Sequence, residues 1–193
     1  MKGSSMPSAV MLLRHAEKPL GDGPPHGVRL DGTQDPESLT PRGWQRAGAL
    51  VGLFVSDPST GQVPRLPTPT HLVASQIGPQ SSSERPRETL VPLGDRLGLT
   101  VDSRFRKEEV GELALAVREI DGVVLIAWEH HLVPSIATAL MGGASSVPQT
   151  WPDERYDVVW VIEGADGARR LRQVPQLVLA GDRPETIEAD PPE

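Results

Sequence analysis

The sequence predicts an α/β domain with a largely parallel central sheet. Short apolar runs alternate along the chain with longer segments whose apolar residues recur at helical spacing, and this alternation is typical of layered α/β folds. Several apolar runs end abruptly in polar residues, as buried parallel strands do where they leave a sheet. A length of 193 residues fits one domain, which we place at 8–182, between a flexible leader over 1–7 and a disordered acidic tail over 183–193.

Strands are expected where short runs of strand-forming residues are bounded by turn-forming residues. These runs cover, in order, 9–13, 71–74, 99–105, 123–128, 157–162 and 169–173. The runs AVMLL, HLVA and VVLIAW are almost entirely apolar, so we expect these strands to be buried on both faces of the sheet. The last two runs flank a turn at 164–167, and we expect them to pair with each other.

Helices are expected between these strands, at about 41–55, 87–97, 108–120 and 133–141. Thr40 followed by Pro41 is typical of a helix N-cap and first turn. Residues 81–84 can cap the second helix, and Gly98 is placed to end it. The Pro- and Gly-rich stretches at 21–38 and 58–69 are expected to be long loops.

The composition argues against several classes of function. Lys and Arg number 19 against 26 Asp and Glu, which gives a net charge of −7 and disfavours a nucleic-acid partner. The sequence contains no cysteine, which excludes disulfides, thiolate metal sites and a cysteine nucleophile. No apolar run approaches the roughly 18 residues of a membrane span, so we expect no membrane partner and a cytoplasmic location.

Arginine and histidine residues stand at three points where strands end or helices begin. Arg14 and His15 follow the first strand, Arg85 opens the second helix, and His130 follows the fourth strand. The guanidinium of arginine matches phosphate oxygens, and histidine can act as a nucleophile, acid or hydrogen-bond donor near neutral pH. If the fold brings these side chains together, they would form a phosphate site without a metal.

These residues lie in motifs that resemble the histidine phosphatase superfamily, the phosphoglycerate-mutase-like proteins. LLRHAEKP at 12–19 is similar to the Arg-His-Gly signature, and ERPRETL at 84–90 is similar to the helix that carries the second arginine. LTPRGWQRA at 39–47 and VVLIAWEHH at 123–131 resemble the two other characteristic segments, in the family's order. WPDERYDVVWVIE and VPQLVLAGD resemble a phosphatase-like branch whose second histidine motif contains Trp-Glu-His.

The resemblance implies a three-layer α/β/α sandwich, phosphoglycerate-mutase-like, and a phosphohistidine mechanism without a metal or other cofactor. It implies that His15 is the nucleophile and that Arg14, Arg85 and His130 form the phosphate pocket with it. Two guanidinium groups beside an imidazole disfavour its protonated form, so they would keep the nucleophile neutral. The same charges would stabilise the equatorial oxygens during phosphoryl transfer.

The general acid is less well defined by the motifs. In mutase-like members it lies between the second arginine and the second histidine, where RKEEVGEL offers Glu108, Glu109 and Glu112. We prefer Glu108, because it is nearest the end of the preceding strand, with Glu109 next. His131 occupies the position where another branch of the superfamily has the acid, and the adjacent histidine pair leaves open which ring faces the site; the strand alignment favours His130.

The leading prediction is a phosphatase that hydrolyses phosphomonoesters through a phosphohistidine on His15. Two alternatives stay open: a non-catalytic or weakly catalytic protein that binds phosphate or phosphorylated ligands, and a phosphomutase. The negative charge favours a small phosphorylated substrate or a phosphoprotein as the partner. The sequence does not indicate the oligomeric state or the identity of the substrate.

Overall fold

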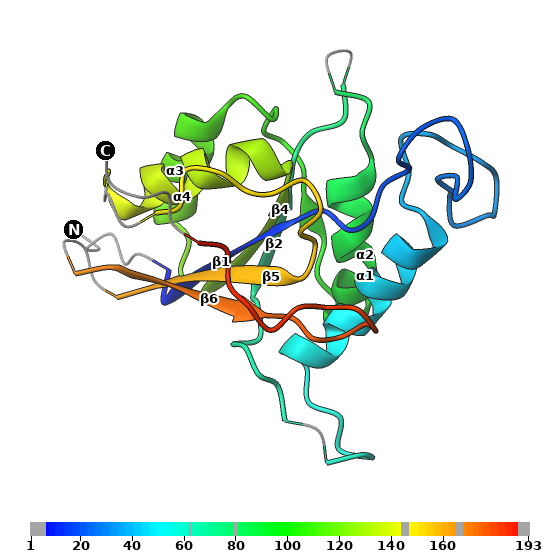
Figure 1. The fold of residues 1–193 in the computed structure, drawn as a ribbon. Coiled ribbons are helices and arrows are strands. Elements are labelled where there is room, and N and C mark those ends of the chain that lie inside the picture. Colours follow the sequence, from blue (N-terminus) through cyan, green and yellow to red (C-terminus); the bar gives the residue numbers. More distant parts are fainter. Residues whose placement is uncertain (1–6, 62, 79–80, 144–146, 165–167, 189–193) are drawn as a thin grey trace.

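A central β-sheet with helices on both faces forms the core of the computed structural model, which describes residues 7–61, 63–78, 81–143, 147–164 and 168–188 (Figure 1). The strands within these ranges are β1 (Ala9–Arg14), β2 (His71–Ala74), β3 (Val101–Asp102), β4 (Val123–Trp128), β5 (Val158–Glu163) and β6 (Arg170–Pro175). The helices are α1 (Pro41–Phe54), α2 (Arg85–Leu97), α3 (Val110–Arg118) and α4 (Val133–Met141), with a 3-10 turn, η1 (His130–Leu132), directly before α4.

The strand order in the described part of the sheet is β3-β2-β4-β1-β5-β6. β1 is parallel to β4, β4 to β2 and β2 to β3, whereas β5 is antiparallel to both β1 and β6. This mixed, mostly parallel sheet confirms the predicted α/β class and the expected pairing of the last two strands. The carboxyl ends of β1, β2 and β4 lie at one edge, where α/β sheets commonly place ligands.

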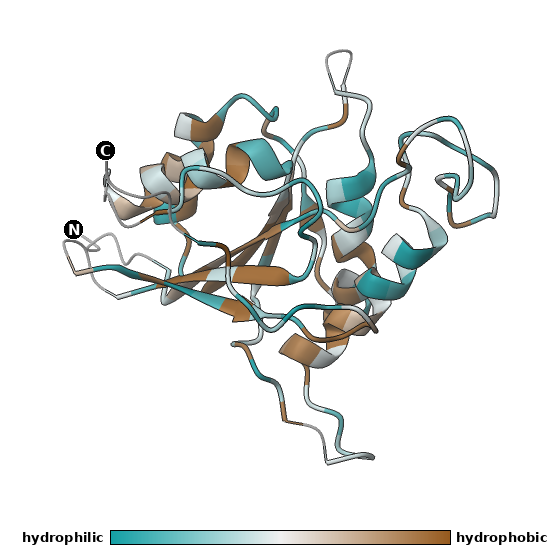
Figure 2. Ribbon diagram, viewed as in Figure 1, coloured by the Kyte–Doolittle hydropathy of each residue, from teal (hydrophilic) through white to brown (hydrophobic). Residues whose placement is uncertain are grey.

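Helices cover the two faces of the sheet in pairs, with α1 and α2 on one face and α3 and α4 on the other (Figure 1). The packing of β1 explains why all of its residues before Arg14 are apolar. Val10 and Leu12 pack with the side chains of α3 and α4, while Met11 and Leu13 pack with those of α1 and α2. Both faces of the central strands are therefore buried, and Figure 2 shows them as hydrophobic ribbons between the helix layers.

The expected N-cap of α1 and the expected glycine at the end of α2 are both found in the structure. The Thr40 side chain accepts a hydrogen bond from the backbone N–H of Gly43, and Pro41 occupies the first turn of α1. α2 begins at Arg85, two residues before the expected start, and its N-cap residue Glu84 makes no side-chain capping hydrogen bond, so the capping expected from 81–84 is not found. The helix ends at Leu97, followed by Gly98, whose φ of 68° is the left-handed conformation that glycine adopts readily.

The segment between α2 and β4 differs most from the sequence prediction. The strand expected over 99–105 is only Val101–Asp102, and the helix expected from 108 begins at Val110. Asp102 ends the strand because its side chain accepts a hydrogen bond from the backbone N–H of Arg104, which turns the chain. The connection up to Val110 is therefore irregular.

The end of the chain is packed as far as the structure describes it. The backbone N–H of Arg183 donates to Asp157, and the side chain of Gln173 bonds the backbone of Ile187, which is buried. Residues 183–188 thus differ from the disorder expected of the tail, because Ile187 supplies an apolar anchor. Residues 189–193 of the expected tail and 1–6 of the expected leader lie outside the described residues.

None of the helices in the described residues is long and apolar enough to cross a membrane.

Candidate functional site

The predicted site residues gather at the carboxyl edge of the sheet, where β1 and β4 end side by side. Arg14 is the last residue of β1 and pairs in register with Trp128, the last residue of β4. The backbone N–H of His15 then donates to the carbonyl of Trp128 at 3.0 Å, which extends the contact one residue beyond the strand. His130 follows two residues after Trp128, at the start of η1.

His15 is a buried, neutral imidazole with a defined tautomer. It is 3% exposed, and its Nδ1 lies 2.7 Å from the carbonyl oxygen of Ala16. Because a carbonyl can only accept, Nδ1 carries the hydrogen and Nε2 keeps its lone pair. Burial lowers the pKa of His15 to about 3, and the positive charges of Arg14 and Arg85 add to the shift, against the opposing effect of the Ala16 hydrogen bond.

Arg14 is 1% exposed and is held by the segment that leads into β5. Its Nη1 donates to the carbonyl oxygens of Pro152, Asp153 and Arg155, and its guanidinium carbon lies 4.0 Å from the ring centroid of Tyr156. Nε and Nη2 are buried and find no hydrogen-bond partner among the described residues. Burial lowers the pKa of Arg14, so two desolvated donors of a cation are left without an acceptor.

Arg85 approaches the site from the first turn of α2. Its Nη2 donates to the carbonyl oxygen of Pro36 at 2.6 Å, and lies 3.4 Å from the carboxylate of Glu37. Its Nη1 reaches the hydroxyl of Ser83. Nε is buried and has no partner within the described part of the chain. Within the described residues, each of the two arginines therefore has at least one buried donor nitrogen without a hydrogen-bond partner.

His130 and His131 face different surroundings. The Nε2 of His130 lies 2.6 Å from Oδ1 of Asp153, whereas His131 is 56% exposed and its Nε2 lies 3.5 Å from Glu129. Burial and the charge of Arg14 lower the pKa of His130 to about 4, against the opposing effect of Asp153. Of the two rings, His130 is thus the one coupled to Arg14.

The predicted acids Glu108 and Glu109 contact residues of their own segment. Glu108 is 55% exposed and lies 3.9 Å from the ammonium nitrogen of Lys107. Glu109 accepts a hydrogen bond from the backbone N–H of Arg106, at the start of α3. No contact that the structure records for either glutamate, among the described residues, is with Arg14, His15, Arg85 or His130.

A second group of residues holds the segment after His15 in place. The Thr89 hydroxyl accepts from the backbone N–H of Ala16 at 2.8 Å and donates to the carbonyl of Arg85, so it ties the two motifs together. Glu17 is bound by Arg46 through both carboxylate oxygens, and Arg46 also pairs with Asp182 at 2.7 Å. Sequence analysis missed these roles, although Thr89 and Arg46 lie inside the motifs that it singled out.

A polar cavity of about 270 Å³ adjoins Arg85. Its walls include Ser81, Ser83, Lys107 and Glu129, so hydroxyl, ammonium and carboxylate groups face the same space. The Ser81 hydroxyl is buried and has no partner in the described part of the chain. The cavity can therefore offer hydrogen bonds to a polar group next to Arg85.

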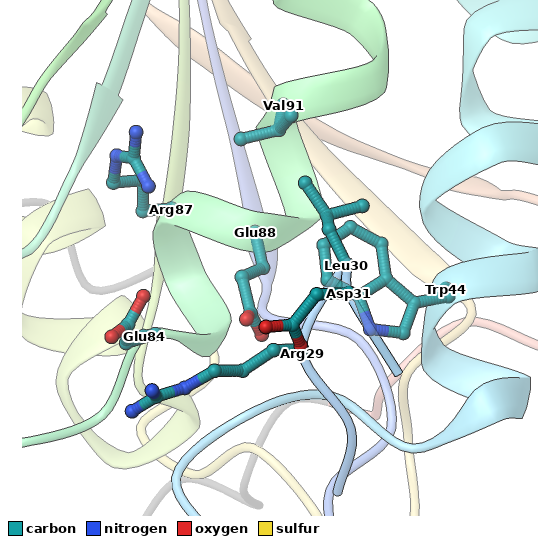
Figure 3. Close-up of a pocket in the computed structure, with 8 residues that line it drawn as sticks. All are labelled: Arg29, Leu30, Asp31, Trp44, Glu84, Arg87, Glu88 and Val91. Atoms are coloured by element: carbon teal, nitrogen blue, oxygen red, sulfur yellow. The ribbon is translucent and has the colours of Figure 1, made fainter. Parts of the chain in front are cut away.

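A larger groove, of about 380 Å³, lies between the loop before α1, Trp44 on α1 and the outer side of α2 (Figure 3). It does not include the predicted site residues. Arg29 at its rim is already paired with Asp35 at 2.7 Å, and Glu88 at its base accepts hydrogen bonds from Ser38 and Leu39. Its polar groups thus serve mainly to pack the loop onto the helices.

The described residues include no cluster of three or more His, Asp or Glu side chains that could hold a metal ion.

The fold of this chain is similar to those of several solved structures. It is similar to that of the protein histidine phosphatase SixA complexed with tungstate, with 19% identity, a TM-score of 0.51 and coverage of 87% of this chain and 97% of that chain. The putative phosphohistidine phosphatase SixA from Agrobacterium tumefaciens matches at 18% identity, a TM-score of 0.44 and coverage of 88% and 96%. Mycobacterial hydrolase 2 matches at 16% identity, a TM-score of 0.40 and coverage of 86% and 88%.

The first of these similarities confirms the phosphoglycerate-mutase-like fold class predicted from the sequence. At such low identity, the likeness extends to the fold alone. No protein-family model matches the sequence, and no curated protein matches it.

Proposed function

We propose that this protein is a metal-independent phosphatase that hydrolyses phosphomonoesters through a phosphohistidine on His15. The observation that carries the proposal is the pairing of a neutral imidazole, whose Nε2 keeps its lone pair, with two buried donors of the adjacent Arg14 that have no partner among the described residues. The imidazole supplies a nucleophile at neutral pH, and the donors supply a site for an anion. The similarity in fold to a histidine phosphatase supports the same conclusion.

The reaction follows from the tautomer of His15. Nε2 attacks phosphorus and the ester P–O bond breaks, which leaves a phosphoryl group on Nε2. Positive charge develops on the ring, and the Ala16 carbonyl stabilises it by accepting the Nδ1 hydrogen. Water then attacks phosphorus, the P–N bond breaks, and inorganic phosphate leaves. Arg14 and Arg85 donate to the phosphoryl oxygens in both steps, and His130 completes the phosphate pocket with them.

The proposed substrate is a small phosphorylated molecule or a phosphoprotein with a polar group next to the phosphate. The cavity beside Arg85 supports this choice, because serine hydroxyls and charged groups line it. Its volume of about 270 Å³ lies near the lower end of small-molecule sites, which run from roughly 300 to 1,000 Å³.

A phosphate-binding protein without turnover is the second candidate. The exposed position of Glu108 favours it, because a phosphatase acting on alkyl esters needs an acid at the leaving oxygen. The two candidates share the anion pocket and differ only in whether the P–O bond breaks.

Release of inorganic phosphate from 4-nitrophenyl phosphate, with EDTA present and over about pH 5 to 8, tests the proposal. We expect turnover in the wild type and its loss in His15→Ala. His71→Ala is the matched control, because His71 is exposed at the start of β2, at the opposite edge of the sheet. Unchanged turnover in His15→Ala would refute the phosphohistidine. No turnover in the wild type, together with a rise in melting temperature on adding vanadate, would favour the binding protein.

A further inference from the structure

The site contains a carboxylate, Asp153, that lies in the segment WPDERYDVVWVIE but to which the motifs gave no role, and it contacts His130 directly. Oδ1 of Asp153 is 2.6 Å from Nε2 of His130, and the Asp153 side chain is 81% exposed. The backbone carbonyl of the same residue accepts a hydrogen bond from Nη1 of Arg14. Asp153 is therefore held through its backbone by one predicted phosphate ligand, while its exposed carboxylate contacts another.

The short distance between Asp153 and His130 requires a proton between the two atoms. A carboxylate oxygen and an unprotonated ring nitrogen would repel each other at 2.6 Å, so one of them carries hydrogen. Since the low pKa of His130 keeps its ring neutral, the pair holds this proton either as an imidazole N–H or as a carboxylic acid O–H. This proton lies beside a group expected to bind a phosphoryl oxygen.

The contacts recorded for the other carboxylates near the site are with residues other than His130. Glu17 is bound by Arg46, and Glu37 lies beside Arg85. Glu129 faces Lys107 and His131, at 3.7 and 3.5 Å. Among the described residues, Asp153 is the carboxylate with a recorded contact to His130, and this contact distinguishes it from Glu108.

We propose that Asp153 is the general acid and base of the reaction, an inference that rests on the proposed phosphatase function. In the first step its carboxyl proton moves to the ester oxygen while His15 Nε2 bonds to phosphorus and the P–O bond breaks, so the alcohol leaves neutral. In the second step the Asp153 carboxylate takes a proton from the attacking water. The P–N bond breaks, the electron pair returns to Nε2, and Asp153 is protonated again.

The test is the dependence of kcat/KM on the pKa of the leaving group, for the wild type, Asp153→Asn and Glu108→Gln. The series runs from 2,4-dinitrophenyl phosphate through 4-nitrophenyl and phenyl phosphate to glycerol phosphate. This parameter ends at the first irreversible step, so it reports departure of the leaving group and not hydrolysis of the phosphohistidine. Glu154→Gln is the matched control, because Glu154 is the adjacent exposed carboxylate and lies 3.6 Å from Arg183.

An acid is needed only when the leaving group is a poor one. We expect Asp153→Asn to lower kcat/KM for glycerol phosphate by about 10²- to 10⁴-fold and to leave the dinitrophenyl ester nearly unchanged. Glu154→Gln is expected to follow the wild type across the series. Because the Asp153 side chain is exposed, the substitution leaves the packed core intact, which circular dichroism and the melting temperature can verify.

Two results would overturn the assignment while leaving the phosphatase function in place. An equal loss for every ester in Asp153→Asn would show that Asp153 only positions His130. A steeper leaving-group dependence in Glu108→Gln, with Asp153→Asn unaffected, would place the acid at Glu108. A wild type without turnover, or one matched by His15→Ala, would instead refute the function on which the inference rests. The two kinds of failure are therefore distinguishable.

Discussion

The close approach of α1 to the segment after His15 predicts opposite effects for two Gly-to-Ala substitutions in one helix. A Cβ at Gly43 would lie 2.5 Å from the carbonyl oxygen of Glu17 and 3.1 Å from its backbone nitrogen. A Cβ at Gly48 would meet nothing within 4 Å. The same Glu17 carbonyl also accepts from the backbone N–H of Thr40 at 3.0 Å, so the backbone there has little room to move.

The magnitudes follow from two terms. Alanine is the better helix former at both positions, by up to about 1 kcal/mol, so Gly48→Ala is expected to raise the free energy of unfolding by that amount. Gly43→Ala gains a similar term but adds an overpacking cost of about 1–3 kcal/mol, because the atom it meets is backbone. The two variants should differ by this cost, which corresponds to roughly 2–12 °C in melting temperature for a domain of this size.

Thermal unfolding followed by circular dichroism measures the difference, and phosphate release provides a second readout. Glu17 lies two residues after His15, so a displaced Glu17 is expected to misplace the nucleophile and lower kcat in Gly43→Ala, while Gly48→Ala keeps wild-type turnover. Equal melting temperatures for the two variants would refute the close packing of α1 against this segment.

Three further predictions concern buried groups around the site. Arg46→Met leaves the buried carboxylate of Asp182 without its partner, and urea denaturation should show a loss of about 3–5 kcal/mol; a loss below about 1 kcal/mol would contradict the pairing. Thr89→Val removes the acceptor of the Ala16 N–H and should cost about 1–3 kcal/mol in the same assay, with Thr89→Ser restoring most of it. The pKa of His15, lowered to about 3, means that the unfolded chain binds a proton below about pH 6.5 that the folded protein does not. Unfolding free energy should therefore fall by about 2 kcal/mol from pH 7 to pH 5 through this group, and an equally steep fall in His15→Gln would show that other groups cause it.

The elements of the fold were predictable where local sequence and tertiary packing agree. The runs at 9–13 and 123–128 are apolar because β1 and β4 are covered on both faces of the sheet. A continuous apolar run of this length can be recognised as a buried strand from the sequence. The run at 99–105 was read as a strand for its composition, but the pairing with β2 ends at Asp102. The spacing of apolar residues does not predict where the side chain of a single aspartate turns the backbone and ends a strand.

The site was predictable only in the part that motifs describe. Arg14, His15, Arg85 and His130 were named from segments that follow strands or open a helix, and their places in the fold follow from strand order. Asp153 lies within WPDERYDVVWVIE, a segment that the motifs included, but its role could not be predicted, because its contact with His130 depends on the path of the chain between α4 and β5. Such contacts depend on the tertiary path of the loop rather than on local residue spacing.

Arg14 contributes to the proposed anion pocket and also contacts the proposed proton donor, Asp153. Nε and Nη2 of the buried Arg14 have no hydrogen-bond partner in the described part of the chain, which costs free energy that other contacts of Arg14 must offset. The compensation comes from Nη1, which binds the carbonyls of Pro152, Asp153 and Arg155, and from the face of Tyr156. The contacts that keep the cation buried and ready for an anion are thus the same contacts that fix the backbone of Asp153 over His130. Substituting Arg14 would consequently remove both the proposed phosphate ligand and the contact that holds the backbone of Asp153, so the two proposed functions of this edge of the sheet have a single structural origin.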